Sequence, residues 1–417
     1  MKITALETVR LTERPSLVWV QVQTDEGVVG LGESWFGAEI LEADIHGRIA
    51  ALVLGEDPAH IEALNRKMRP YAGYCGSGAE IRAVSALDVA LWDIAGKVCG
   101  KPICDLLGGR CREHIVVYNT CAGPGYVSQS SDVRPRNFGL AAAAEGNNSQ
   151  ASGAHGFSAP AAGAEFQDLH GFLQRADDLA ASLLEMGIES MKIWPFDFAE
   201  SATDGMTLNA RDMKTALEPF EKIRKAHGDR IRIKAELHGL WTLPAAKAIC
   251  HELEDYDVDW VEDPIWMDRT AQLPLLAQST RLPIAGGETL GGLGQMQDLI
   301  AAGGIDHPIV DVTWGGGITF AKKAAALAES RALPIAFHDC SGPVTLTAST
   351  HLALNCPNVR EQEITRGFYY GWYHECVDEV PPLADGRITV SGRPGLGLSL
   401  QPDIASRPGA VVRRSEL

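Results

Sequence analysis

The chain has 417 residues, of which 45% are hydrophobic and 22% are charged, and this composition excludes collagen-like and wholly disordered proteins. Lys and Arg total 37 against 54 Asp and Glu, so the net charge is −17. A surface of this sign repels phosphate backbones and anionic lipids, so we expect neither nucleic acid nor a membrane as a partner.

The cysteines and the hydropathy of the chain predict the cellular compartment of the protein. The nine cysteines include no Cys-x-x-Cys pair, and several stand in apolar stretches, which is typical of reduced, buried thiols. The first residues lack the apolar segment of a signal peptide, and no run of 18 apolar residues occurs anywhere. We therefore expect a cytoplasmic protein.

The first hundred residues predict an α+β unit. Antiparallel strands are expected between residues 2 and 34, where Asp25-Glu26-Gly27 supplies a turn. The pattern becomes helical over residues 40–68. Apolar residues then recur at spacings of three and four from Ile81 to Val98, before Gly100-Lys101-Pro102 ends the helix. The expected domain covers residues 1–113.

The sequence pattern changes at residue 115. From there on, short runs of β-branched residues alternate with helical stretches. Eight strands are expected, at residues 115–119, 191–194, 231–237, 258–262, 283–288, 307–312, 334–338 and 359–364. Repeated strand–helix units predict parallel strands, and eight of them favour a closed barrel over an open doubly wound sheet. The expected barrel covers residues 114–384, and residues 385–417 form a C-terminal segment.

One segment interrupts the barrel pattern after its first strand. Residues 122–164 are rich in Gly, Ala, Ser and Asn and weakly apolar. A loop of this length is either a lid over the site or an inert linker. Loops that follow barrel strands lie on the face where active sites form, so the lid is favoured.

Polar side chains stand at the ends of nearly all the expected strands. They are Lys192, Glu236, Glu262, Glu288, Asp311, His338 and Glu363. From Glu236 onward, successive members lie about 25 residues apart, which is one strand–helix unit. Buried carboxylates are costly unless they are paired or bind a metal, and barrel strand ends converge at one rim. The pattern therefore predicts a functional site there.

Three glutamates on consecutive strands offer only oxygen ligands. Glu236, Glu262 and Glu288 would suit Mg²⁺ better than zinc or copper, which prefer nitrogen or sulfur. The alternative is that these carboxylates are rim groups paired with Lys192 or Lys234.

These motifs resemble the enolase superfamily, in particular its mandelate racemase subgroup. The resemblance rests on the three carboxylates, Asp311 before Gly315-Gly316-Gly317, His338, the hairpin over residues 24–33, the helix and turn over residues 85–109, and Pro394-Gly395-Leu396-Gly397. It spans nearly the whole chain except residues 122–164. It implies an α+β capping domain on a modified TIM barrel, (β/α)₇β, with Mg²⁺-assisted proton abstraction next to a carboxylate, and a homo-oligomer.

The resemblance also implies roles for residues at the rim. Sites of this superfamily pair a Lys or His base with Mg²⁺. His338 is the expected base, and Asp311 on the neighbouring strand can accept its ring N–H and fix its tautomer. Lys192 matches the first lysine of the second strand, and Glu363 matches the acid of the eighth strand, with Glu361 as the alternative.

Two departures from the subgroup bear on the reaction. Racemases carry a second lysine as the opposite base, but Trp194 occupies that position and cannot titrate. His238 stands where racemases commonly have Asn, and some acid-sugar dehydratases of the subgroup place a His there. His238 would donate a proton to a leaving hydroxyl, or it would orient Glu236.

One base and one candidate acid predict β-elimination of water from a sugar acid, which yields a 2-keto-3-deoxy acid. For the substrate we expect contacts from Trp35, Tyr74, Trp194 and Arg366, since aromatic rings suit a polyol and Arg suits a carboxylate. Two alternatives remain open. One is a racemase, epimerase or cycloisomerase of the same subgroup, and the other is a non-catalytic metal-binding sensor.

Overall fold

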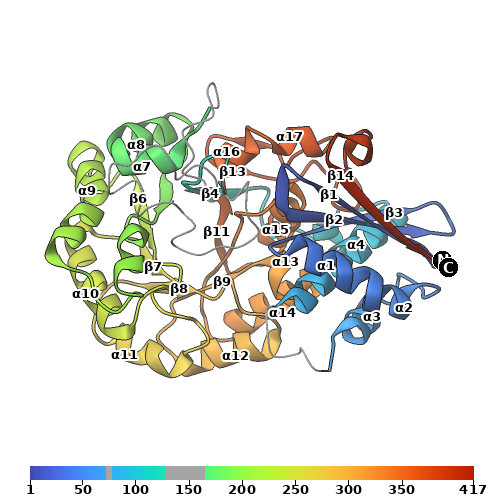
Figure 1. Cartoon of the computed structure of the whole chain (residues 1–417), viewed down its shortest axis with the longest axis horizontal. Helices are drawn as coiled ribbons and strands as arrows, with labels where there is room; N and C mark the ends of the chain where they lie inside the picture. Colours follow the sequence, from blue (N-terminus) through green and yellow to red (C-terminus); the bar gives the residue numbers. More distant parts are fainter. Residues whose placement is uncertain (72–77, 127–164) are drawn as a thin grey trace.

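The computed structural model describes residues 1–71, 78–126 and 165–417, which form a parallel barrel beside a separate antiparallel sheet (Figure 1). The expected lid lies outside the described residues from residue 127 onward, and so does Tyr74. Among the described helices, none is long and apolar enough to cross a lipid bilayer. The eight cysteines within these ranges are free thiols.

The capping unit is built on a four-stranded antiparallel sheet in the order β14–β1–β2–β3. Its strands are β1 (Ile3–Leu11), β2 (Arg14–Thr24), β3 (Val29–Trp35) and β14 (Ala410–Glu416). Strand β14 comes from the far end of the chain and pairs along β1, so both termini lie together at one end of the molecule (Figure 1). The domain boundaries expected at residues 113 and 384 stay predictions.

Helices cover this sheet. They are α1 (Ala38–Asp44), a π-helix (Ile45–Ile49), α2 (Ala50–Val53), α3 (Ile61–Met68), α4 (Ala79–Cys99) and the short α5 (Ile103–Leu106). The helical stretch expected over residues 40–68 is thus broken between residues 53 and 61. Helix α4 packs directly on β3 because Gly30 and Gly32 have no side chain, and a Cβ at either position would overlap a carbonyl oxygen of α4.

The barrel is closed, so the predicted fold class is confirmed and the open doubly wound sheet is wrong. Its parallel strands are β4 (Ile115–Thr120), β5 (Ser190–Ile193), β6 (Arg232–Glu236), β7 (Trp260–Glu262), β8 (Ile284–Gly286), β9 (His307–Val310), β10 (Ile335–Phe337) and β11 (Val359–Ile364). Pairing of β11 with β4 closes the ring. A short antiparallel extension, β12 (Leu383–Ala384) and β13 (Arg387–Ile388), continues from β4.

The longer helices follow the strands and surround the barrel (Figure 1). They are α7 (Asp168–Gln174), α8 (Ala176–Glu185), α9 (Ala210–His227), α10 (Leu243–Leu253), α11 (Leu273–Ala277), α12 (Leu293–Ala302), α14 (Gly317–Glu329) and α15 (Pro343–Asn355). Short helices cap several loops, namely α13 (Val312–Gly315), α16 (Arg366–Tyr369), α17 (Tyr373–Cys376) and four 3₁₀ turns (residues 197–202, 254–256, 270–272 and 404–406).

Several strands end earlier than the sequence predicts. Strand β8 stops at Gly286 because Gly286 and Gly287 both have positive φ, so Glu288 lies beyond the strand. Asp311 was expected within a strand, but it follows β9 as the N-cap of α13. In both places the chain turns at the rim, and the polar residue is carried by the turn.

Below the rim, the barrel interior is filled with side chains. One layer consists of Tyr118, Trp260, Ala285, Ile309 and Ala336, all buried. Lys234 lies against the rings of Tyr118 and Trp260 and pairs with Asp259 at 2.9 Å and Glu361 at 3.3 Å. The barrel is therefore closed beneath its rim by a packed, ion-paired plug.

A buried histidine joins the barrel to the C-terminal segment and predicts acid sensitivity. His351 of α15 accepts from the backbone N–H of Cys104 at Nδ1 (3.3 Å) and donates from Nε2 to the carbonyl oxygen of Leu396 (3.0 Å). Burial lowers the pKa of His351 to about 4 from an ordinary 6.5. Between these values the unfolded chain binds a proton that the folded chain excludes, so stability falls as the pH drops.

Between pH 7 and pH 4, we expect the free energy of unfolding to fall by up to about 3 kcal/mol less in His351→Gln than in the wild type. The variant should nevertheless be less stable than the wild type at pH 7. Urea unfolding at several pH values measures this difference. His60→Gln, at an exposed position, is the control. If His351→Gln and the wild type lose the same free energy of unfolding between pH 7 and pH 4, His351 is not the source of the acid sensitivity.

Candidate active site

Three buried carboxylates gather at the rim of the barrel. Glu236 ends β6, Glu262 ends β7 beside it in register, and Glu288 follows β8. One carboxylate oxygen of each lies within 4.8 Å of the others. A side chain at Gly286 would collide with Asp263 and Met267, so the glycine turn allows Glu288 to approach its neighbours.

Lysine pairing accounts for only part of this cluster. Lys192 Nζ lies 2.7 Å from Glu262, 2.8 Å from Glu363 and 3.2 Å from Glu236. Burial opposes the charge of Lys192, but the three carboxylates outweigh it and raise its pKa well above the ordinary value. Pairing with lysine, the alternative to metal binding, therefore accounts for Glu236 and Glu262. It does not account for Glu288.

The remaining charge favours a bound cation. Burial raises the pKa of Glu262 well above its ordinary value and also raises that of Glu288, and the neighbouring carboxylates add to both shifts. Within the described part of the chain, Oε2 of Glu288 is buried and accepts no hydrogen bond, and its ion pair with His338 Nε2 is long, at 3.5 Å. An all-oxygen set with excess negative charge and an unsatisfied oxygen fits a hard divalent ion such as Mg²⁺.

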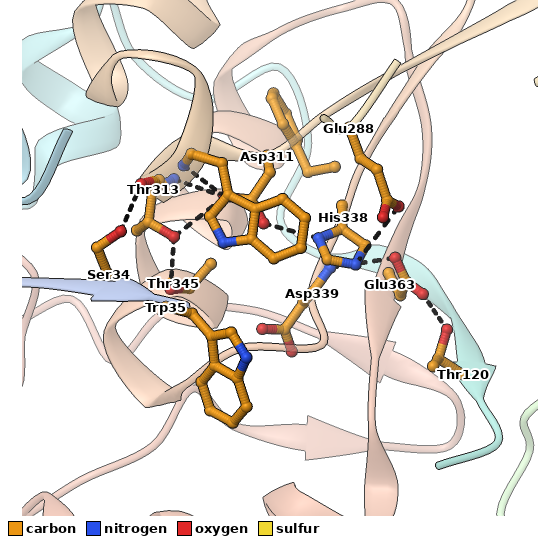
Figure 2. A network of polar contacts seen from close by, with 12 residues as sticks. Ser34, Trp35, Thr120, Glu288, Asp311, Thr313, His338, Asp339, Thr345 and Glu363 are labelled. Carbon is orange, nitrogen blue, oxygen red and sulfur yellow. Dashed lines mark hydrogen bonds and ion pairs between the residues drawn. The ribbon is translucent and has the colours of Figure 1, made fainter. Parts of the chain in front are cut away.

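A histidine–aspartate pair lies next to the carboxylates (Figure 2). His338 Nδ1 donates to Oδ2 of Asp311 at 2.7 Å, and Nε2 lies 3.5 Å from Glu288. Oδ1 of Asp311 accepts the backbone N–H groups of Thr313 and Trp314, which fixes the carboxylate at the start of α13. Burial opposes protonation of His338, but Glu288, Glu363 and Asp311 outweigh it and raise its pKa to about 10.

A second histidine–aspartate pair lies at the same rim of the barrel. His238 Nδ1 donates to Oδ2 of Asp197 at 2.7 Å, and the backbone N–H of His238 donates to Glu236 at 2.7 Å. Burial opposes protonation of His238, but Asp197 and Glu236 raise its pKa to about 9. The sequence analysis missed Asp197, which follows β5 by four residues and stands in a turn without periodicity.

The two candidate acids of β11 lie at different depths. Glu363 accepts hydrogen bonds from Thr120, from the phenol of Tyr118 at 3.1 Å and from the backbone of Asp339 at 3.1 Å. Glu361 lies in the plug, where it pairs with Arg232 and Lys234. Glu363 therefore borders the cavity and Glu361 does not.

The rim encloses a cleft with about 460 Å³ of empty space, part of it open to solvent. Its lining combines four aromatic rings with the charged groups. The lining residues are Phe36, Thr120, Tyr126, Lys192, Trp194, Glu236, His238, Glu288, Trp314, His338, Cys340 and Glu363. Of the three expected substrate contacts that the structure describes, only Trp194 is among them. The sequence analysis assigned no role to Thr120, Tyr126, Trp314 or Cys340.

Two expected substrate contacts are corrected by the structure. Trp35 packs against Phe368 and Trp372 inside the cap–barrel contact, and its neighbour Phe36 lines the cleft instead. Arg366 is 3% exposed and forms a bidentate pair with Asp168, at 2.7 Å for each hydrogen bond. Its guanidinium is therefore committed to structure and does not line the cleft.

Two family models match most of the chain. The family model of the mandelate racemase/muconate lactonizing enzyme N-terminal domain matches residues 3–108, and the enolase C-terminal domain-like model matches residues 175–404. A D-galactonate dehydratase of Xanthomonas oryzae pv. oryzae is 30% identical over 98% of this chain and 94% of its own length. The D-galactonate dehydratase of Pectobacterium atrosepticum is 29% identical over 100% and 95%.

Two solved structures are also similar to the chain over its whole length. An enolase of the mandelate racemase subgroup from Agrobacterium tumefaciens is 42% identical, with a TM-score of 0.84 over 100% of this chain and 99% of its own. An enolase protein from the environmental genome sequencing of the Sargasso Sea is 39% identical, with a TM-score of 0.85 and the same coverage.

Proposed function

Because the chain belongs to the mandelate racemase/muconate lactonizing enzyme family of the enolase superfamily, we propose that it is a Mg²⁺-dependent sugar-acid dehydratase. It is an enzyme of the hydro-lyase class, like the D-galactonate dehydratases that it resembles over nearly its whole length. The proposed reaction removes the α-proton and the 3-hydroxyl of a sugar acid, and the enol product tautomerises to a 2-keto-3-deoxy acid.

Glu236, Glu262 and Glu288 would hold the metal ion. Positive charge from a bound Mg²⁺ would stabilise the enediolate more than the substrate, since proton loss adds a second negative charge to a carboxylate. The support is the shared position of the three carboxylates and the unsatisfied oxygen of Glu288.

His338 is the proposed base. Glu288 is the largest contributor to the raised pKa of His338, and a cation bound to Glu288 would offset that contribution. With Nδ1 bound to Asp311, Nε2 is then the nitrogen that would accept the α-proton, and the carboxylate of Asp311 would stabilise the imidazolium that results. Lys192 lies on the cleft wall, where its ammonium can donate a hydrogen bond and positive charge to the developing oxyanion, and Glu363 holds that ammonium in place at 2.8 Å.

His238 is the proposed acid. Strands β6 and β10 are four positions apart in a ring of eight, so His238 and His338 stand on opposite walls of the cleft. One histidine can therefore take the α-proton while the other gives a proton to the departing hydroxyl. This opposition of two histidines across a carboxylate cluster is the observation that carries the proposal.

Racemisation lacks comparable support. The second base of the racemases stands where Trp194 lies in this chain, and an indole cannot titrate. Lys192, the lysine that lines the cleft, is bound to three carboxylates.

The test is incubation of the Mg²⁺-loaded protein with a panel of aldonic and aldaric acids. We expect one or more of them to give a 2-keto acid, detected by semicarbazide absorbance. Deuterium at Cα in D₂O without keto acid would instead support epimerisation. Neither signal, with Mg²⁺ still bound in calorimetry, would support a metal-binding sensor.

A further inference from the structure

The acid side of the cleft is constructed like the base side. In each case a histidine after a barrel strand donates Nδ1–H to a buried aspartate at 2.7 Å, namely His238 to Asp197 and His338 to Asp311. Each aspartate comes from the preceding strand–helix unit, after β5 and after β9. Both histidines line the cleft, and neither aspartate does.

Asp197 is placed to serve His238. It lies in the 3₁₀ turn that follows β5, and its side chain is fully buried. Oδ1 has no hydrogen-bond partner among the residues that the structure describes, so the pair with His238 is the principal interaction of this carboxylate. Burying a carboxylate is costly, and the hydrogen bond to His238 offsets part of that cost for Asp197.

His238 is held from three directions. Its backbone is in the left-handed region, with φ of 49°, and its N–H donates to Glu236. The edge of its ring packs against Trp194, with centroids 5.7 Å apart. Nδ1 is bound to Asp197, and the residue lines the cleft, so a substrate in the cleft would meet the Nε2 side of the ring.

We infer that Asp197 is a positioning residue that fixes the tautomer and orientation of His238 for leaving-group protonation. The inference rests on the proposed function, because it needs a leaving hydroxyl. In that step the C3–O bond breaks as Nε2–H of His238 gives its proton to the oxygen, and water departs. The electron pair of the enediolate forms the C2–C3 double bond, and the neutral histidine keeps Nδ1–H on Asp197.

The decisive experiment compares Asp197→Asn with Asp311→Asn on the best sugar acid of the panel. We expect Asp197→Asn to lower kcat for dehydration about 100-fold while KM changes little, since residues that orient a functional histidine through a hydrogen bond contribute up to this scale. The base is intact, so substrate recovered from D₂O should carry deuterium at Cα. Asp311→Asn should lose both dehydration and exchange.

A substrate with fluorine in place of the 3-hydroxyl separates positioning from a structural role. Fluoride leaves with the C–F electron pair and needs no proton from His238, so Asp197→Asn should release fluoride at nearly the wild-type rate. An equal loss on both substrates, or unchanged dehydration by Asp197→Asn, would overturn the inference. A wild type that makes no keto acid from any sugar acid would refute the proposed function itself, and the inference with it.

Discussion

Replacement of His338 by Asn is expected to abolish turnover and to leave Mg²⁺ binding intact. Asn can occupy much of the same space and can hydrogen-bond Asp311, but it cannot accept the α-proton. General-base groups contribute about 10² to 10⁴ in rate, so we expect kcat/KM to fall by about 1,000-fold or more. Exchange of the α-proton in D₂O should disappear together with dehydration, because exchange and dehydration both begin with abstraction of that proton.

Metal affinity distinguishes loss of the base from loss of the site. His338 lies 3.5 Å from Glu288 and is not one of the three carboxylates, so calorimetry should show no fall in Mg²⁺ affinity in His338→Asn. His251→Asn, on the exposed face of α10, is the matched control and should retain turnover. Persistent proton exchange in His338→Asn would place the base elsewhere.

Replacement of Glu288 by Gln is expected to weaken Mg²⁺ binding by about 100-fold or more, because a carboxylate that binds the metal contributes at least as much as a group that only orients a ligand. The substitution keeps the shape of the side chain and removes the charge from the member of the triad that Lys192 does not pair with. Calorimetric titration gives the affinity directly. The rise in Tm on addition of Mg²⁺ gives an independent measure, since ligands that bind only the folded state stabilise it.

The control is Glu361→Gln, another buried carboxylate on the inside of the same barrel. Glu361 pairs with Arg232 and Lys234 in the plug and does not line the cleft. Its replacement should lower Tm and leave Mg²⁺ affinity unchanged. Equal affinities in Glu288→Gln and the wild type would refute the proposed ligand set.

The sequence by itself determined the architecture and the chemistry available at the rim. Repeated strand–helix units require parallel strands, and parallel strands in a closed ring bring all their carboxyl ends to one mouth. A polar residue at each strand end therefore becomes a cluster without further information. For this reason the spacing of Glu236, Glu262 and Glu288 predicted a shared site that the structure brings within 4.8 Å.

Only the tertiary structure decided which neighbours of that rim face the cleft. Glu361 and Glu363 have the same parity on β11, and their depth in the barrel separates them. Phe36 lines the cleft in place of the expected Trp35, and the chain turns between them, with φ of 67° at Phe36. Turns and long side chains follow no periodicity, so the pairing of Arg366 with Asp168, and of His238 with Asp197, depends on contacts between segments far apart in sequence.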